Sequence, residues 1–203
     1  MEFDRALIPA LSEVVADLPS VRLLQGDALS APWEELLEPG AWRVAANLPY
    51  NVAVPVLLRA LETAPGVEEY VVMVQREVAE RLTGAPGSDG YGPTSLRVAF
   101  RTETEMLRMV PPSVFWPRPH VGSAIVRLRV REPDPSVDAD RLFSVIDIAF
   151  AERRKTMRSA LRRLGVRADR VEPVLRSAEI DPDARPESLP LDRFVGLAEL
   201  VGG

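Results

Sequence analysis

Asn47-Leu48-Pro49-Tyr50 brings an amide, a proline and an aromatic ring together. Residues of these types suit a site in which the exocyclic amine of a nucleobase acts as the nucleophile. Such an amine is a poor nucleophile, because its lone pair is conjugated with the ring. Acceptors on the two amine hydrogens, here the Asn47 side-chain oxygen and the Leu48 carbonyl, would help to localise that lone pair. Tyr50 would stack on an extruded base, and Pro49 stiffens the turn without adding a competing amide hydrogen. Alone, the motif fits a plain strand-end turn equally well.

The elements around this turn place it at the edge of a sheet where ligands bind. Trp42–Ala46 is a short apolar run typical of a buried strand, and Val52–Leu61 has the pattern of a helix. Open α/β sheets bind their ligands at the carboxyl ends of strands. We therefore expect the turn to face a ligand.

Two carboxylates near the N-terminus are candidates for the same ligand edge. Asp27 follows a strand predicted over Val21–Gln25, and its carboxylate could accept from an adenine amino group, although such a residue is more often part of a surface turn. Glu2 precedes a helix predicted over Asp4–Asp17. A carboxylate at that type of position hydrogen-bonds ribose hydroxyls in nucleotide-binding folds.

A proline-rich loop over residues 111–119 holds Phe115 and Trp116 between prolines. Prolines fix such a loop with little residual entropy. A large ring held rigidly beside the ligand edge suits base stacking. The competing interpretation is that Phe115 packs under its own loop, as most phenylalanines do.

A run of basic residues without an anion extends from residue 153 to residue 163. Arg154, Arg158 and Arg162 recur every four residues and would share one face of a helix predicted over Lys155–Leu164. Because the chain has a net charge of −5, we expect this face to meet RNA phosphates rather than to be only a solvated face. The six cations are Arg153, Arg154, Lys155, Arg158, Arg162 and Arg163.

The composition excludes several classes of protein. With 203 residues, 46% of them hydrophobic and 27% charged, the chain has the make-up of a soluble globular protein. It has neither an apolar run of membrane-spanning length nor a signal-like start, so we expect a cytoplasmic protein that is not bound to a membrane. Cysteine is absent and His120 is the single histidine, which excludes disulfides, thiolate catalysis and a cysteine or multi-histidine metal site.

The order of the predicted elements indicates two parts. Strands and helices alternate over residues 1–132, which predicts a mostly parallel α/β sheet. Tyr70–Val74 is continuously apolar, as in a strand buried on both faces. Residues 133–203 begin within a proline-containing linker over residues 132–136 and predict a small all-α domain. The other predicted strands and helices cover residues 77–82, 94–100, 104–110, 123–130, 142–151, 168–176 and 191–201.

Together these segments resemble the ribosomal small-subunit RNA adenine dimethyltransferase family. The resemblance covers nearly the whole chain in order and is far more specific than any one motif. It rests on Gly26-Asp27-Ala28-Leu29, Asn47-Leu48-Pro49-Tyr50-Asn51, Val74-Gln75-Arg76-Glu77-Val78-Ala79-Glu80-Arg81-Leu82, Tyr91-Gly92, residues 110–119, Val121-Gly122-Ser123-Ala124 and Phe150-Ala151-Glu152-Arg153-Arg154-Lys155-Thr156-Met157-Arg158.

The resemblance implies an enzyme with a class I, Rossmann-like methyltransferase sheet and a helical domain that recognises rRNA. With S-adenosylmethionine as methyl donor, it would dimethylate N6 of two adjacent adenosines near the 3′ end of small-subunit rRNA during ribosome biogenesis. Its partner would be the assembling small subunit, and it would act as a monomer. The implied roles are amine positioning by Asn47, Leu48 and Pro49, adenine stacking by Tyr50 and Phe115, and cofactor binding by Glu2, Asp27, Ala28 and Asn47.

One departure from the family bears on activity. The family carries a strand and a Gly-rich loop before the position matched by Glu2, whereas this sequence begins at Met1. We therefore expect an N-terminally truncated copy that lacks the first strands of the sheet. Residues 1–203 alone should bind the cofactor weakly, be catalytically silent and be poorly soluble.

Two other functions remain open. One is a large-subunit rRNA adenine methyltransferase of the antibiotic-resistance type, which the resemblance disfavours because that family more often has isoleucine at the position of Leu48. The other is a non-catalytic RNA-binding assembly factor, which a cofactor-binding measurement would distinguish from both enzymes.

Overall fold

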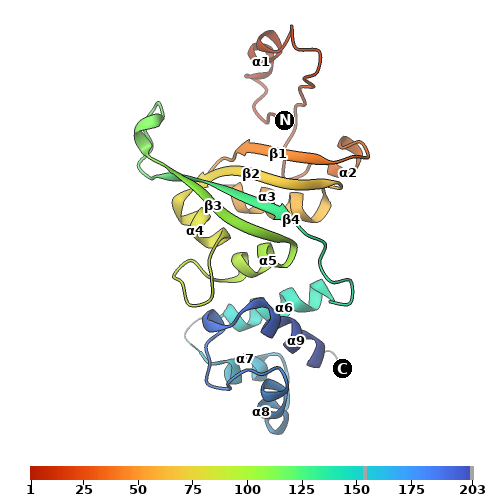
Figure 1. The fold of residues 1–203 in the computed structure, drawn as a ribbon, viewed down its shortest axis with the longest axis vertical. Helices are drawn as coiled ribbons and strands as arrows, with labels where there is room; N and C mark the ends of the chain where they lie inside the picture. The colour runs from red at the N-terminus through yellow and green to blue at the C-terminus, as the bar shows by residue number, and fades with distance from the viewer. Residues whose placement is uncertain (153–154, 202–203) are drawn as a thin grey trace.

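The computed structural model describes residues 1–152 and 155–201. Three parts follow one another along its long axis: an N-terminal segment, a sheet with its helices, and a group of C-terminal helices (Figure 1). No helix among the described residues is long and apolar enough to span a membrane.

The described sheet has four strands in the order β1-β2-β4-β3. Among the described neighbouring pairs only β1–β2 is parallel, and β4 runs antiparallel to both β2 and β3. Three of the four described strands, β1, β2 and β3, thus run in one direction, as the expected mostly parallel sheet requires, and β4, which lies between β2 and β3, opposes them. The bounds are β1 Trp42–Asn47, β2 Val67–Gln75, β3 Thr102–Val110 and β4 Ser123–Val130.

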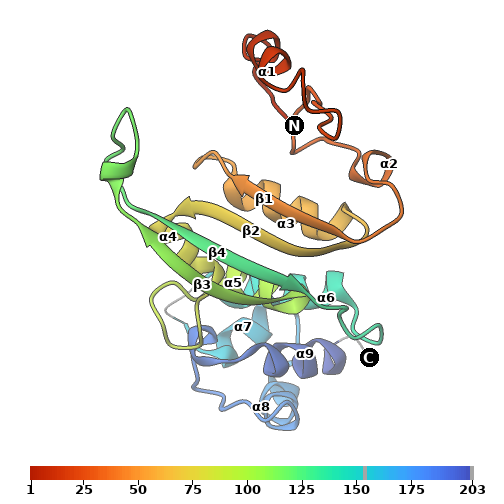
Figure 2. The same cartoon turned by 45° about the horizontal axis from the view of Figure 1, so that its top comes forward.

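Three helices cover one face of this sheet, as Figure 2 shows: α3 (Ala53–Thr63), α4 (Arg76–Leu82) and α5 (Pro93–Arg101). The strands meet them with side chains of period two, such as Val72 and Val74 of β2, which are at most 1% exposed.

The other face of the sheet is only partly covered. Val71 and Met73, which point away from α3, α4 and α5, are half-buried. The apolar run Tyr70–Val74 predicts a strand buried on both faces, and this prediction is wrong. The described helices α3, α4 and α5 all pack against one face, so only that face is fully buried.

The N-terminal segment contains two short helices, α1 (Ile8–Val14) and α2 (Trp33–Leu36). The strand predicted over Val21–Gln25 does not form; the described chain has there a single parallel bridge between Glu2 and Gln25. A strand needs a neighbour along its whole length to take its backbone hydrogen bonds. Among the described residues this segment meets such a neighbour only at Glu2, whose amide donates to the Leu24 carbonyl at 2.8 Å.

The C-terminal helices form a second apolar core, and α5 lies between the two cores. Leu96 and Phe100 of α5 pack with this core, whereas Val98 on its other side packs with the sheet. The boundary at residue 132 stays a prediction. The helices are α6 Ala139–Phe150, α7 Met157–Arg163, α8 Ala168–Ser177 and α9 Leu191–Leu200, with a short 3-10 helix at Pro186–Ser188.

Two buried tyrosines should make the protein lose stability in alkali. Burial raises the pKa of Tyr70 to about 12, and burial together with the Asp192 carboxylate raises the pKa of Tyr91 to about 12. In the unfolded chain both hydroxyls titrate near pH ~10, so the folded state keeps protons that the unfolded state releases. The free energy of unfolding should therefore fall as the pH rises from about 10 to about 12, by at most roughly 3 kcal/mol for each tyrosine.

Urea titrations from about pH 8 to about pH 11.5 would measure this decline. Few other side chains titrate in this pH range, since the sequence has no cysteine and Lys155 is its single lysine. Tyr91→Phe should remove about half of the pH dependence. It also removes the bond that the Tyr91 hydroxyl donates to the Leu189 carbonyl at 2.6 Å, a loss expected at every pH. A free energy of unfolding that stays constant over this range would contradict the prediction.

Candidate active site

The Asn47-Leu48-Pro49-Tyr50 turn lies at the carboxyl end of β1, as the sequence predicts. The Leu48 amide donates to the Met73 carbonyl of β2 at 3.1 Å, and the Val52 amide donates to the Pro49 carbonyl at 3.1 Å. The first bond ties the turn to the sheet, and the second closes it just before α3 begins at Ala53. The backbone of the turn is thus held from both sides.

The turn and the proline-rich loop face the same cavity, which has a volume of about 340 Å³. Tyr50 and Phe115 are both half-buried, and Phe115 belongs to neither apolar core. The structure therefore brings together all five residues that the sequence analysis places at the reacting base. The lining residues are Asn47, Leu48, Pro49, Tyr50, Phe115, Trp116, Pro117 and Pro119.

A hydrogen bond to a residue far away in the sequence holds the Tyr50 side chain in place. The Tyr50 hydroxyl shares a hydrogen bond with the hydroxyl of Ser123, 73 positions further along the chain, with an oxygen–oxygen distance of 2.9 Å. Ser123 is fully buried at the start of β4, between Gln75 of β2 and Val110 of β3. Ser123 belongs to one of the segments that carry the resemblance, but sequence reasoning gave it no role, because a serine after a loop carries no local signal of this contact.

The edge of the cavity offers acceptors. Within the described chain, neither the Asn47 side chain nor the Leu48 carbonyl takes part in a hydrogen bond. Both can therefore accept from an external donor, and an amine with two hydrogens matches two acceptors on consecutive residues.

The two N-terminal acidic residues lie on backbone segments that are hydrogen-bonded to each other, and neither residue lines this cavity. The Gly26 amide donates to the Glu2 carbonyl at 2.9 Å, which sets Asp27 beside Glu2. The Asp27 carboxylate accepts from the Leu29 amide at 2.9 Å and so shapes the turn around Ala28. The Glu2 carboxylate accepts from the Asp4 amide at 2.8 Å. Each carboxylate keeps a second oxygen that can serve a ligand.

The helix that carries the predicted basic face begins later than the sequence predicts. Helix α7 begins at Met157, after the Thr156 cap, rather than at Lys155. Its first two amides, those of Met157 and Arg158, donate to the Ala184 and Pro182 carbonyls at 2.9 and 3.1 Å. Tertiary contact with this loop thus sets where the helix starts. Arg153 and Arg154 lie outside the described residues.

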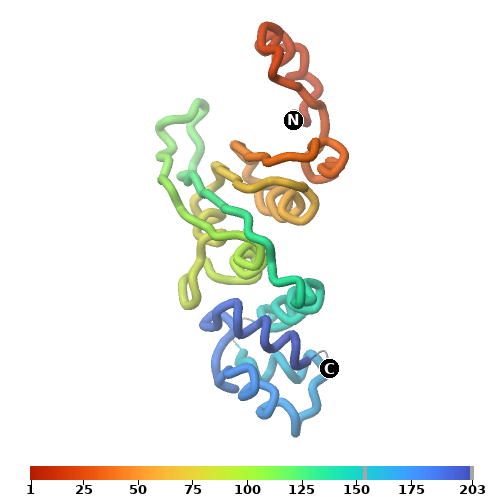
Figure 3. The backbone as a smooth tube through the Cα atoms, turned by 45° about the vertical axis from the view of Figure 1, so that its right-hand side comes forward, coloured from red at the N-terminus to blue at the C-terminus, as the bar shows by residue number. Residues whose placement is uncertain are grey.

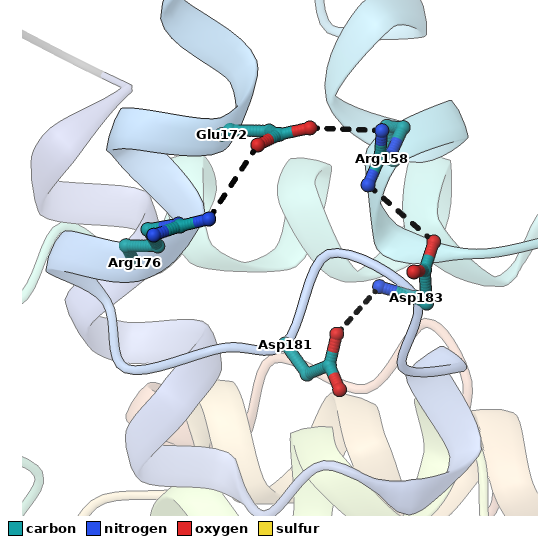
Figure 4. A network of polar contacts seen from close by, with 5 residues as sticks. All are labelled: Arg158, Glu172, Arg176, Asp181 and Asp183. Atoms are coloured by element: carbon teal, nitrogen blue, oxygen red, sulfur yellow. Dashed lines mark hydrogen bonds and ion pairs between the residues drawn. The ribbon is translucent and has the colours of Figure 1, made fainter.

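Arg158 has anionic partners within the chain, as Figure 4 shows. Its guanidinium lies 2.8 Å from a Glu172 oxygen and 3.5 Å from an Asp183 oxygen. Glu172 also meets Arg176 at 3.7 Å. Acidic residues of later segments therefore meet the predicted cationic face at Arg158, because the fold brings them against it. Its contact with RNA stays a prediction.

Substitutions at Arg162 and at Arg158 of α7 should have different effects, one on RNA binding and the other on stability. Arg162 is exposed and makes no ion pair with any residue that the structure describes. Arg162→Gln should change the slope of log affinity against log salt by about one unit in RNA binding, with stability unchanged within about 0.5 kcal/mol. Arg158→Gln should lower the free energy of unfolding by about 1 kcal/mol without RNA. Salt titrations and urea unfolding measure the two effects, and an unchanged slope would make Arg162 a solvated residue.

Solved structures define the class of protein. The structure titled "Crystal structure of 23S rRNA methyltransferase ErmE" has a TM-score of 0.74 at 25% identity and covers 100% of this chain and 80% of that chain. A dimethyladenosine transferase from Plasmodium falciparum has a TM-score of 0.82 at 21% identity and covers 96% of this chain and 78% of that one. The chain is thus a methyltransferase with a Rossmann-like fold.

Sequence comparison names the family within this class. The family model described as Ribosomal RNA adenine dimethylase matches residues 1–201. Ribosomal RNA small subunit methyltransferase A of Thermobifida fusca (strain YX) is 43% identical over 206 residues, which are 98% of this chain and 71% of that protein. The protein of the same name from Streptomyces coelicolor is 41% identical over 207 residues, with the same two coverages. The chain belongs to the ribosomal RNA adenine dimethylase family, which confirms the resemblance found in the sequence.

Proposed function

We propose that this protein uses S-adenosylmethionine to dimethylate N6 of two adjacent adenosines near the 3′ end of small-subunit rRNA. The observation that carries the proposal is the cavity at the end of β1, where Asn47 and Leu48 lie beside Tyr50 and Phe115. The relatives named for small-subunit rRNA support this substrate, since they are 41–43% identical along almost the whole chain.

Different groups in the cavity bind different parts of an adenine. The Asn47 oxygen and the Leu48 carbonyl accept from the two hydrogens of the exocyclic amine and orient its lone pair. The rings of Tyr50 and Phe115 take the faces of the base once it leaves its helix. Ser123 holds the Tyr50 ring in place through its hydroxyl. Because these groups are held before substrate arrives, positioning supplies most of the acceleration.

The N-terminal carboxylates fit a nucleoside-containing methyl donor. Glu2 and Asp27 lie on neighbouring backbone segments, and each carboxylate has an oxygen beyond the one that accepts from a backbone amide. Such acceptors match ribose hydroxyls and an adenine amino group, which are hydrogen-bond donors. We assign Glu2 to the ribose, and Asp27 with Ala28 to the adenine. S-adenosylmethionine, when bound, would supply a methyl group on a sulfonium, from which the sulfur leaves readily as a neutral thioether.

The basic segment before and within α7 is the proposed contact for rRNA phosphates. Lys155 and Arg162 are exposed, and Arg163 pairs with Glu152 at 3.3 Å. Arg153 and Arg154, which lie outside the described residues, are assigned to this contact from the sequence alone. We propose the assembling small subunit in the cytoplasm as the site of action, with the protein acting as a monomer.

The test is methyl transfer by protein expressed from the full open reading frame that encodes residues 1–203. Purified small-subunit particles and large-subunit rRNA, both lacking the modification, are incubated with labelled S-adenosylmethionine. Nucleoside analysis should find N6,N6-dimethyladenosine at two neighbouring positions of the small-subunit rRNA alone. Label in the large-subunit rRNA would favour the activity named for ErmE. RNA binding without label or cofactor binding would favour a non-catalytic assembly factor.

A further inference from the structure

The loop between β3 and β4 projects beyond the end of the sheet. Figures 1 and 3 both show it, in green, as an arm that extends past the carboxyl end of β1. Residues Pro112–Val114 form a 3-10 turn in this loop, and prolines stand on both sides of Phe115 and Trp116. Prolines restrict the backbone, so the arm presents these two rings in a defined arrangement.

The two neighbouring rings have opposite environments. Phe115 is half-buried and lines the cavity, whereas the Trp116 side chain is 97% exposed. This exposure exceeds that of any other large apolar side chain that the structure describes. Trp116 nevertheless lines the same cavity and therefore stands at its mouth. A large apolar ring kept in water beside a binding site marks a surface for a ligand.

The type of ring identifies the ligand. Aromatic side chains on an RNA-binding surface stack with bases, and stacking requires no particular hydrogen-bond pattern, since every base has a π-face. Trp116 presents a large ring without close packing against the protein, so one face is available to a base. In an RNA strand, the nucleotide nearest to an extruded base is its neighbour along the backbone.

We propose that Trp116 stacks on the nucleobase next to the adenosine held between Tyr50 and Phe115. This inference rests on the proposed function and deepens it, because it gives the site two positions: one for the base that reacts and one for the adjacent base. It also explains why Phe115 and Trp116 are consecutive, since consecutive rings on a rigid arm can meet consecutive nucleotides.

The experiment measures binding of an RNA hairpin whose single-stranded loop carries two adjacent adenosines. A second RNA has an abasic site in place of the neighbouring base. The variants are Trp116→Ala, Trp116→Tyr and a control, Val114→Ala. Val114 suits this purpose because it is 62% exposed on the same arm but does not line the cavity. Affinity is followed by fluorescence anisotropy of labelled RNA, and methyl transfer is measured on the same RNAs.

Trp116→Ala should weaken binding of the intact hairpin about tenfold to a hundredfold, and Trp116→Tyr should restore most of it. The abasic RNA should bind the unaltered protein with a similar loss. It should bind Trp116→Ala with no further loss, because the ring and the base are then both removed from one contact. Val114→Ala should bind both RNAs like the unaltered protein.

Additive losses from Trp116→Ala and the abasic site would overturn the inference, as would an unchanged affinity of Trp116→Ala for the intact hairpin. In these cases methyl transfer by the unaltered protein leaves the proposed function standing. If the unaltered protein does not bind the hairpin, the inference fails, and methyl transfer to the small-subunit particle then decides the proposed function separately.

Discussion

Replacing Asn47 with alanine should lower kcat for methyl transfer about a hundredfold to a thousandfold, which is the usual cost of removing one preorganised polar group at a reacting centre. The Asn47 oxygen is proposed to accept from the amine that attacks, so its loss leaves the lone pair conjugated with the ring. The side chain is exposed at the end of β1 and makes no hydrogen bond within the described chain. The fold should therefore be unaffected, and KM for RNA should change little.

Two variants control this experiment. Asn47→Asp keeps an oxygen acceptor and should retain at least about tenfold more activity than Asn47→Ala. Arg43→Ala changes another exposed residue of β1 that does not line the cavity, and it should leave kcat at saturating RNA unchanged. If Asn47→Ala keeps kcat within about threefold, a loss of less than 1 kcal/mol, the Asn47 side chain does not position the amine.

Tyr50→Ala should lower kcat/KM by about tenfold to a hundredfold or more, since base stacking on an aromatic ring contributes roughly 1–3 kcal/mol. S-adenosylmethionine affinity should hardly change, because the proposed cofactor carboxylates do not line this cavity. Single-turnover methylation of the small-subunit particle and calorimetry with S-adenosylmethionine measure the two quantities. A comparable loss of cofactor binding would mean that Tyr50 serves the cofactor site or the fold.

Variants that remove the hydrogen bond between Tyr50 and Ser123 distinguish the contribution of the Tyr50 ring from that of its hydroxyl. Tyr50→Phe keeps the ring and should lose about threefold to tenfold in activity, the typical effect of one neutral hydrogen bond. Ser123→Ala removes the same bond from the other side and should have a similar effect. The double variant should be no worse than either single one, because both changes act through one contact. Additive losses would show that Ser123 acts on the site in another way.

Local signals in the sequence were sufficient for most of the elements and for the position of the Asn47–Tyr50 turn in the candidate site. The apolar run before Asn47 and the periodic pattern after Tyr50 predict a strand and a helix, and β1 and α3 are present there. Placing the turn at a ligand edge follows from the general geometry of α/β sheets. The helices after residue 138 follow from 3.6-residue periodicity in the same way. These predictions succeed because each depends on residues within one or two turns of each other.

Tertiary structure alone decided the contacts between distant segments. It placed Ser123 against Tyr50, acidic residues against Arg158, and Trp116 in water while its neighbour Phe115 turns inward. It also left Val21–Gln25 without a strand partner beyond the bridge to Glu2 in the described chain. Strand pairing, ion pairs and side-chain burial depend on which surfaces meet, and composition and spacing along one segment carry no information about its partner in space.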